Sequence, residues 1–203
     1  FEHPEMLAIA KKHKLPQMEK LVAEAFPESA FENVQASLDN MVKVVSRSSM
    51  VSVFEKPKFR DTVKVLAEPE REMLVWGLQQ FLYGDQPSGF EDMVSVLHAH
   101  KLAKWSLMTV IPVYMQPLRE VFVKPTTAKG VIQYFELEGL HYKPTPSWSF
   151  YSGYRDAIEA MKSQVDAGLA PSNPAFTGFL MMSLPEEYLP KRPMPKPKDE
   201  PAA

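Results

Sequence analysis

Histidines are the residues of this sequence that could bind a metal or transfer protons, and two of them, His98 and His100, lie close together. On a helix, residues two apart point about 200° away from each other, whereas metal-binding helices place their ligands three or four residues apart. Imidazoles and Lys101 are favoured near the negative C-terminal end of a helix without any metal. The chain has no cysteine, which excludes thiolate metal sites and cysteine nucleophiles. We therefore expect no metal site and no cofactor.

Acidic residues gather at Glu68, Glu70 and Glu72, which could be read as a carboxylate cluster for acid–base chemistry. They stand at the start of a predicted helix, however, where each carboxylate is stabilised by about 0.3–1 kcal/mol without any catalytic role. No GxSxG motif surrounds a serine, and no glycine-rich nucleotide loop occurs. These observations favour a protein that is not an enzyme.

Charge is distributed unevenly along a chain whose formal net charge is −2 and whose pI is near 6.3. Residues 66–97 hold one basic residue against six acidic ones, and residues 98–131 hold five basic residues against one acidic. The basic part could bind nucleic acid through a helix-turn-helix-like segment over 101–143. Glu136, Glu138 and a long proline-bound connector argue against it. The candidate contacts are Lys101, Lys104, Arg119, Lys124, Thr126, Thr127 and Lys129.

Aromatic residues are concentrated between residues 105 and 151. Trp105, Tyr142, Trp148 and Tyr151 form either a structural cluster in the core or the wall of a small-molecule pocket, so an enzyme with an aromatic pocket is a second alternative. We predict the structural role for Trp148 and Tyr151, both of which should be buried.

The elements that position these residues are predicted to be helices. Proline begins a helix well because its missing N–H is not needed in the first turn, and Pro69, Pro146 and Pro174 each precede helical periodicity. Capping-box patterns at Ser29–Glu32 and Ser88–Glu91 predict helix starts near 30 and 89. The expected fold is an all-α irregular bundle of eight or nine short helices.

Two segments are less clear. Residues 104–115 are rich in β-branched side chains but have no visible partner strand, so we predict a buried helix that bends or ends near Pro112. Residues 119–123 have weak strand-like alternation. After them, a helix is expected from about Thr127 to Leu137, closed by Gly139.

The predicted organisation is one helical domain over residues 1–189, with possible sub-lobes 1–66 and 67–189. Residues 190–203 are rich in proline and predict an extended tail. No apolar run is long enough to span a membrane. A cytoplasmic or other soluble compartment is therefore expected, although a targeting segment ahead of Phe1 would not be visible. The leading hypothesis is a non-enzymatic interaction module that binds another protein.

Residues 122–154 resemble a segment of bacterial proteins of uncharacterised function, in which a KPT turn, a short helix and a YxPxPxWxxY connector follow one another. The resemblance covers about a sixth of the chain and implies a bounded structural unit without implying an activity. The residues that carry it are Lys124, Pro125, Thr126, Tyr142, Pro144, Pro146, Trp148 and Tyr151.

Overall fold

The structure, a computed structural model, describes residues 13–188, which form nine α-helices and no strand. The all-α prediction is confirmed. Two short 3₁₀ segments lie between helices, at Glu28–Glu32 and Ala167–Leu169, and a third follows the last helix, at Glu186–Tyr188. The helices are α2 (Leu15–Ala25), α3 (Val34–Arg47), α4 (Glu55–Val65), α5 (Glu68–Tyr83), α6 (Gln86–Ala99), α7 (Trp105–Met115), α8 (Pro125–Tyr134), α9 (Trp148–Lys162) and α10 (Asn173–Ser183).

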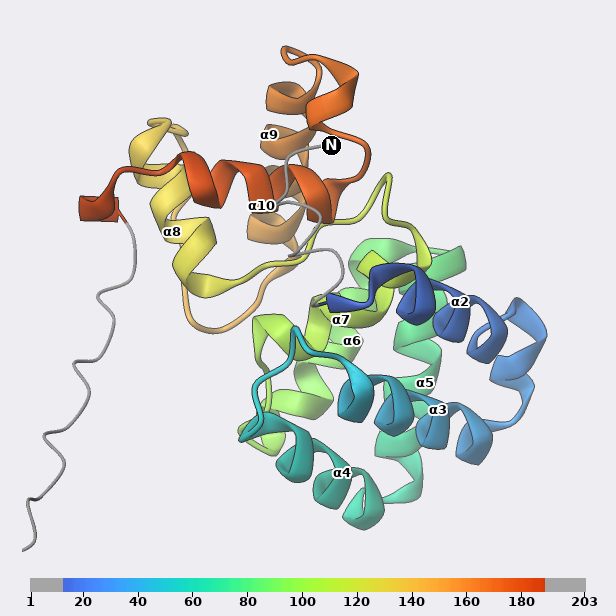
Figure 1. The fold of residues 1–203 in the computed structure, drawn as a ribbon. Coiled ribbons are helices and arrows are strands. Elements are labelled where there is room, and N and C mark those ends of the chain that lie inside the picture. Colours follow the sequence, from blue (N-terminus) through green and yellow to red (C-terminus); the bar gives the residue numbers. More distant parts are fainter. Residues whose placement is uncertain (1–12, 189–203) are drawn as a thin grey trace, which may run out of the picture.

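Helix α7 lies among the helices of the first group, α2 to α6, and contacts α2, α3, α5 and α6 (Figure 1). Its sequence is apolar on every side, which is typical of a helix with no solvent-facing surface. The helix continues through Pro112 to Met115, so the expected end near Pro112 is not observed. Pro112 cannot donate a backbone hydrogen bond, but burial of the whole helix among its neighbours compensates for the missing bond.

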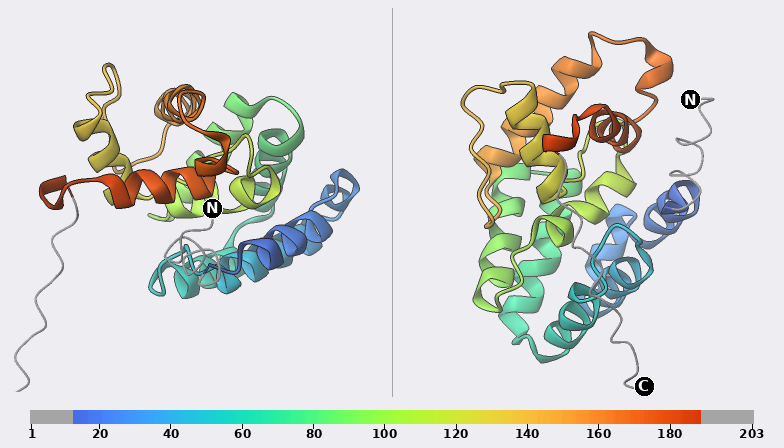
Figure 2. Two further views of the ribbon diagram at one scale, coloured as in Figure 1. Left: turned by 45° about the horizontal axis from the view of Figure 1, so that its top comes forward. Right: turned by 60° about the vertical axis from the view of Figure 1, so that its left-hand side comes forward.

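Helices α8, α9 and α10 form a second group beside the first (Figures 1 and 2). Helix α10 contacts both α8 and α9, and α9 also contacts α6. Within the first group, α3 contacts both α4 and α5, so the helices on either side of residue 66 meet each other.

A buried carboxylate links the two groups. Glu120, which is 1% exposed, accepts hydrogen bonds from Gln86 of α6 at 2.9 Å and from the Tyr151 hydroxyl of α9 at 2.7 Å. Arg155, one turn further along α9, donates to both carboxylate oxygens at 3.2 Å. The loop after α7 is thereby fixed between α6 and α9.

The two predicted capping boxes do not form, and each helix begins a few residues away from the predicted start. Ser29 and Glu32 lie in a 3₁₀ segment, and α3 begins at Val34 after Asn33, whose side chain accepts the Ala36 N–H at 2.9 Å. Helix α6 begins at Gln86, so Ser88 is inside its first turn. The Glu91 carboxylate instead accepts the backbone N–H of Trp148 at 2.8 Å.

The chain between α7 and α9 also differs in detail from expectation. Residues 120–124 are extended but pair with no strand among the described residues. Helix α8 begins at Pro125 and ends at Tyr134, three residues earlier than the expected Leu137, and Gly139 adopts a positive φ of 76° in the turn that follows. The predicted proline-rich tail over 190–203 lies outside the described residues.

No helix among residues 13–188 is long and apolar enough to cross a lipid bilayer.

Candidate functional site

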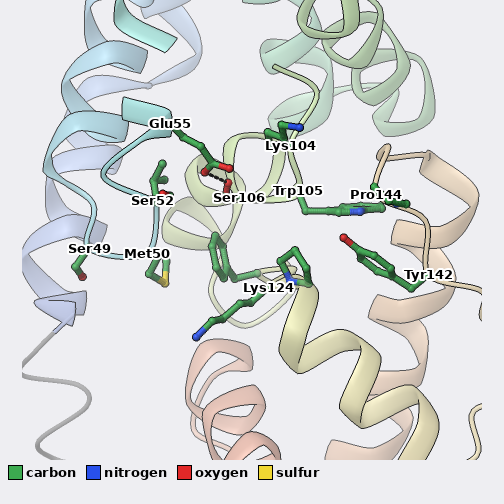
Figure 3. Close-up of a pocket in the computed structure, with 13 residues that line it drawn as sticks. Ser49, Met50, Ser52, Glu55, Lys104, Trp105, Ser106, Lys124, Tyr142 and Pro144 are labelled. Carbon is green, nitrogen blue, oxygen red and sulfur yellow. Dashed lines mark hydrogen bonds between the residues drawn. The ribbon is translucent and has the colours of Figure 1, made fainter. Parts of the chain in front are cut away.

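A cavity of about 520 Å³ opens where the loop before α4 meets the starts of α7 and α8 (Figure 3). Segments far apart in the sequence form it, because the first group supplies one side and the chain around α8 supplies the other. Its lining residues are Ser49, Met50, Val51, Ser52, Glu55, Lys104, Trp105, Ser106, Phe122, Lys124, Pro125, Tyr142 and Pro144.

One side of the cavity is apolar and rigid. Trp105 is 2% exposed and donates its indole N–H to the Lys143 carbonyl at 2.8 Å, which fixes the orientation of its ring. The Tyr142 ring lies 6.4 Å from it, centroid to centroid, and Pro144 lies beside Trp105 in Figure 3. Because the indole N–H is already satisfied, Trp105 offers the cavity only carbon surface.

Hydroxyl groups and one carboxylate provide the polar lining. Ser106 Oγ donates to Glu55 Oε2 at 2.6 Å, which joins the first turns of α7 and α4. Burial raises the pKa of the Tyr142 phenol above its ordinary value of 10, so this hydroxyl stays protonated at neutral pH. Figure 3 shows it pointing into the cavity. A ligand would therefore meet both a neutral donor and a charged acceptor.

Two lysines give the lining an excess of positive charge. Lys104 and Lys124 immediately precede α7 and α8, and both side chains are exposed. Figure 3 places them on different sides of the cavity. Among residues 13–188, no carboxylate lies within ion-pair distance of either ammonium group. Since Glu55 is the one acidic residue in the lining, the lining carries two positive charges against one negative.

The remaining basic candidates do not gather at this cavity. Arg119 lies 3.4 Å from Glu120 and donates to Gln86, so it belongs to the buried network between the two groups. Lys129 lies 4.9 Å from the centre of the Tyr142 ring. Lys101 is exposed just after α6, with a left-handed φ of 60°. Thr126 is exposed, whereas Thr127 is buried.

The four aromatic candidates belong to one connected cluster, but only two of them reach the cavity. Phe90 lies between them, with its ring centre 6.2 Å from that of Trp105, 5.8 Å from Trp148 and 5.3 Å from Tyr151. Tyr151 is fully buried, and Trp148 is partly buried beneath the guanidinium group of Arg155. Trp148 and Tyr151 therefore support the core, while Trp105 and Tyr142 line the cavity.

The second residue of the histidine pair contacts a carboxylate. His100 Nε2 lies 2.8 Å from Glu70 Oε1, a contact between the end of α6 and the start of α5. No cluster of three metal-ligating side chains occurs within the part of the chain that the structure describes.

Glu55, Ser106 and Phe122 are site residues that sequence reasoning missed. Nothing in their spacing links them, since Glu55 and Ser106 are 51 residues apart. The nearest sequence signal is the four serines among residues 46–52, a composition typical of a loop. A loop alone does not reveal which distant elements it contacts.

No family model, no curated protein and no solved structure matches this chain. The resemblance noted for residues 122–154 therefore stays a prediction.

Proposed function

We propose that this is a non-enzymatic binding protein that recognises a segment of another protein at the cavity between α4, α7 and α8. The observation that supports it most is the pairing of a rigid aromatic wall with two lysines that have no acidic partner in the described structure. Binding sites typically combine apolar walls with a few polar groups that set orientation.

Exposed apolar residues beside the cavity favour a polypeptide partner over a small molecule. Val53 and Phe54 are 71% and 77% exposed, and they lie between Ser52 and Glu55, which line the cavity. Two adjacent large apolar side chains this exposed are unusual for a surface loop. A partner that extends beyond the cavity would cover them, whereas a ligand enclosed by the cavity would not.

The lining does not suggest catalysis. Ser106 has a carboxylate partner in Glu55. The lining contains no histidine that could act as a general base for this serine. The Ser106 hydroxyl instead ties α7 to α4. An arrangement of this kind holds the site in shape, which is what a binding surface requires.

Nucleic acid fits the same surface less well. Only Lys104 and Lys124 of the basic candidates line the cavity, and the Glu55 carboxylate belongs to the same lining. Phosphate recognition usually recruits several cations on one face.

Selection from a library of displayed random peptides tests the proposal. Peptides selected on the wild-type protein should fail to bind the Ser52→Trp variant, because the new indole would occupy the cavity entrance. Ser95→Trp, an equally exposed position on α6, is the matched control and should leave binding unchanged.

Two outcomes would overturn the proposal. The first is a selection in which no peptide distinguishes Ser52→Trp from Ser95→Trp. The second is micromolar binding of duplex DNA that weakens steeply with salt and is lost in Lys104→Glu/Lys124→Glu, which would identify the surface as a nucleic-acid site.

A further inference from the structure

From the lining of the cavity we infer that the partner segment presents an apolar or aromatic side chain flanked on both sides by carboxylates. This inference rests on the proposed function, because it specifies the chemistry of the segment that the cavity would accept.

The apolar side chain follows from the shape and lining of the cavity. Trp105, Phe122 and Met50 contribute carbon surface from three different segments, and two prolines add to it. The volume of about 520 Å³ lies within the range of about 300–1,000 Å³ typical of ligand pockets, so one large side chain fits. Phe122 and Tyr142 are the partly exposed rings of the lining, whereas Trp105 is only 2% exposed. These rings suit an aromatic group, since ring pairs gain more than buried area alone provides.

Two separate carboxylates follow from the positions of the lysines. Lys104 and Lys124 lie on different sides of the cavity, so two anionic groups, one for each lysine, match this arrangement better than one (Figure 3). An extended peptide that places its apolar side chain inside the cavity would carry its neighbouring residues toward the two sides. Acidic residues before and after the apolar one would then each meet one lysine.

Carboxylates are favoured over phosphates by Glu55. Its side chain belongs to the same lining as both lysines. A phosphate carries about 1.5 to 2 negative charges at neutral pH, against one for a carboxylate, so each lysine attracts it more strongly and Glu55 repels it more strongly. With two lysines and Glu55 in the lining, two carboxylates leave the occupied site with an excess of about one negative charge, whereas two phosphates leave about two to three. Glu55 thus acts as a specificity residue that disfavours densely charged ligands.

Short synthetic peptides test the inference directly. The probes are labelled glycine- and serine-based peptides with a central phenylalanine and one glutamate on each side, at two different spacings. Matched peptides replace both glutamates by glutamine, both by lysine, both by phosphoserine, or the phenylalanine by alanine. Binding to the full chain is measured by fluorescence polarisation at low salt and at peptide concentrations up to about 1 mM.

The glutamate peptide should bind best at one spacing, and its glutamine counterpart should bind about two- to twentyfold more weakly, because exposed ion pairs contribute modestly. This difference should vanish in Lys104→Gln/Lys124→Gln. It should persist in Lys43→Gln/Lys58→Gln, which removes the same charge from exposed lysines outside the cavity. Glu55→Gln should narrow the preference for glutamate over phosphoserine.

The inference is wrong if no peptide of the series binds, if glutamine and glutamate peptides bind equally, or if the lysine or phosphoserine peptide binds best. The proposed function survives each of these results when displayed peptides of other composition still lose binding to Ser52→Trp. The proposed function itself fails when no displayed peptide loses binding to Ser52→Trp.

Discussion

At the scale of single residues, Glu70 shows how one carboxylate serves two elements. Its Oε2 atom accepts the Ala67 backbone N–H at 2.9 Å at the start of α5, and its Oε1 atom contacts His100 at the end of α6. Both contacts lower the pKa of Glu70 below its ordinary value of 4.5, and the backbone hydrogen bond has the larger effect. The acidic cluster over 68–72 therefore has a structural explanation.

A carboxyl group whose pKa is lower in the folded than in the unfolded state stabilises the fold at pH values above its unfolded-state pKa. That stabilisation is lost as the pH falls through the folded-state pKa. Glu70→Gln should thus be less stable than wild type at pH 5.5, and the difference should shrink at pH 3. The measurement is the free energy of unfolding in urea at both values. Glu72→Gln removes one charge from the same turn and is the control. An equal difference for Glu70→Gln at both pH values would contradict the assignment.

At the scale of elements, the pair α5 and α6 depends on two glycines that allow the helix backbones to meet. A Cβ atom on Gly89 would lie 2.6 Å from the Phe81 backbone nitrogen and against the Gly77 carbonyl oxygen. On Gly77 it would lie 3.0 Å from the Gly89 carbonyl oxygen. Neither backbone can give way as a flexible side chain does, so only glycine fits here.

Gly89→Ala should therefore destabilise the protein by about 1–3 kcal/mol, although alanine has the higher helix propensity. Gly178→Ala is the matched control, because Gly178 lies inside α10 and a Cβ atom there would meet nothing within 4 Å. That variant should gain about 0.5–1 kcal/mol. Urea denaturation measures both, and equal effects at the two positions would show that helix packing does not decide the cost.

At the scale of the whole molecule, the network around Glu120 holds α9 against the first group of helices. Arg155 is its main cationic partner, with 14% of its side chain exposed, whereas Arg119 is 58% exposed. Burial and the neighbouring carboxylate raise the pKa of Tyr151 well above its ordinary value of 10, so its hydroxyl remains a donor to Glu120.

Arg155→Met should cost about 3–5 kcal/mol, because it leaves a buried carboxylate without its closest cation. Arg119→Met should cost less, about 1 kcal/mol, because the Arg119 side chain is largely exposed and Arg155 still pairs with Glu120. In Glu120→Gln/Arg155→Met the amide oxygen can still accept from Gln86, and the Tyr151 hydroxyl can turn to the Val121 carbonyl. No buried charge is left unpaired, so the double variant should lose less than Arg155→Met alone. Denaturation of wild type, Glu120→Gln, Arg155→Met and the double variant gives the coupling energy between the two residues. Strictly additive losses would show that the two groups of helices do not depend on this charge pair.

The sequence by itself determined the features that depend on near neighbours. Proline, glycine and helical periodicity act within a few residues, and they correctly indicated the helices that begin beside Pro69, Pro146 and Pro174, which are α5, α9 and α10. The all-α class follows from the same local signals. Local patterns failed where a distant group competed for the same atoms, as when Glu91 bonds to Trp148 instead of capping α6.

The tertiary structure alone decided the candidate site. Lys104, Lys124, Trp105 and Tyr142 were all recognisable as candidates from the sequence, but so were residues that lie elsewhere, such as Arg119 and Trp148. What brings Glu55 to Ser106 is the packing of α4 and α7 in one core. Such contacts depend on the total free energy of burying many side chains together, and that total cannot be predicted from a short stretch of sequence.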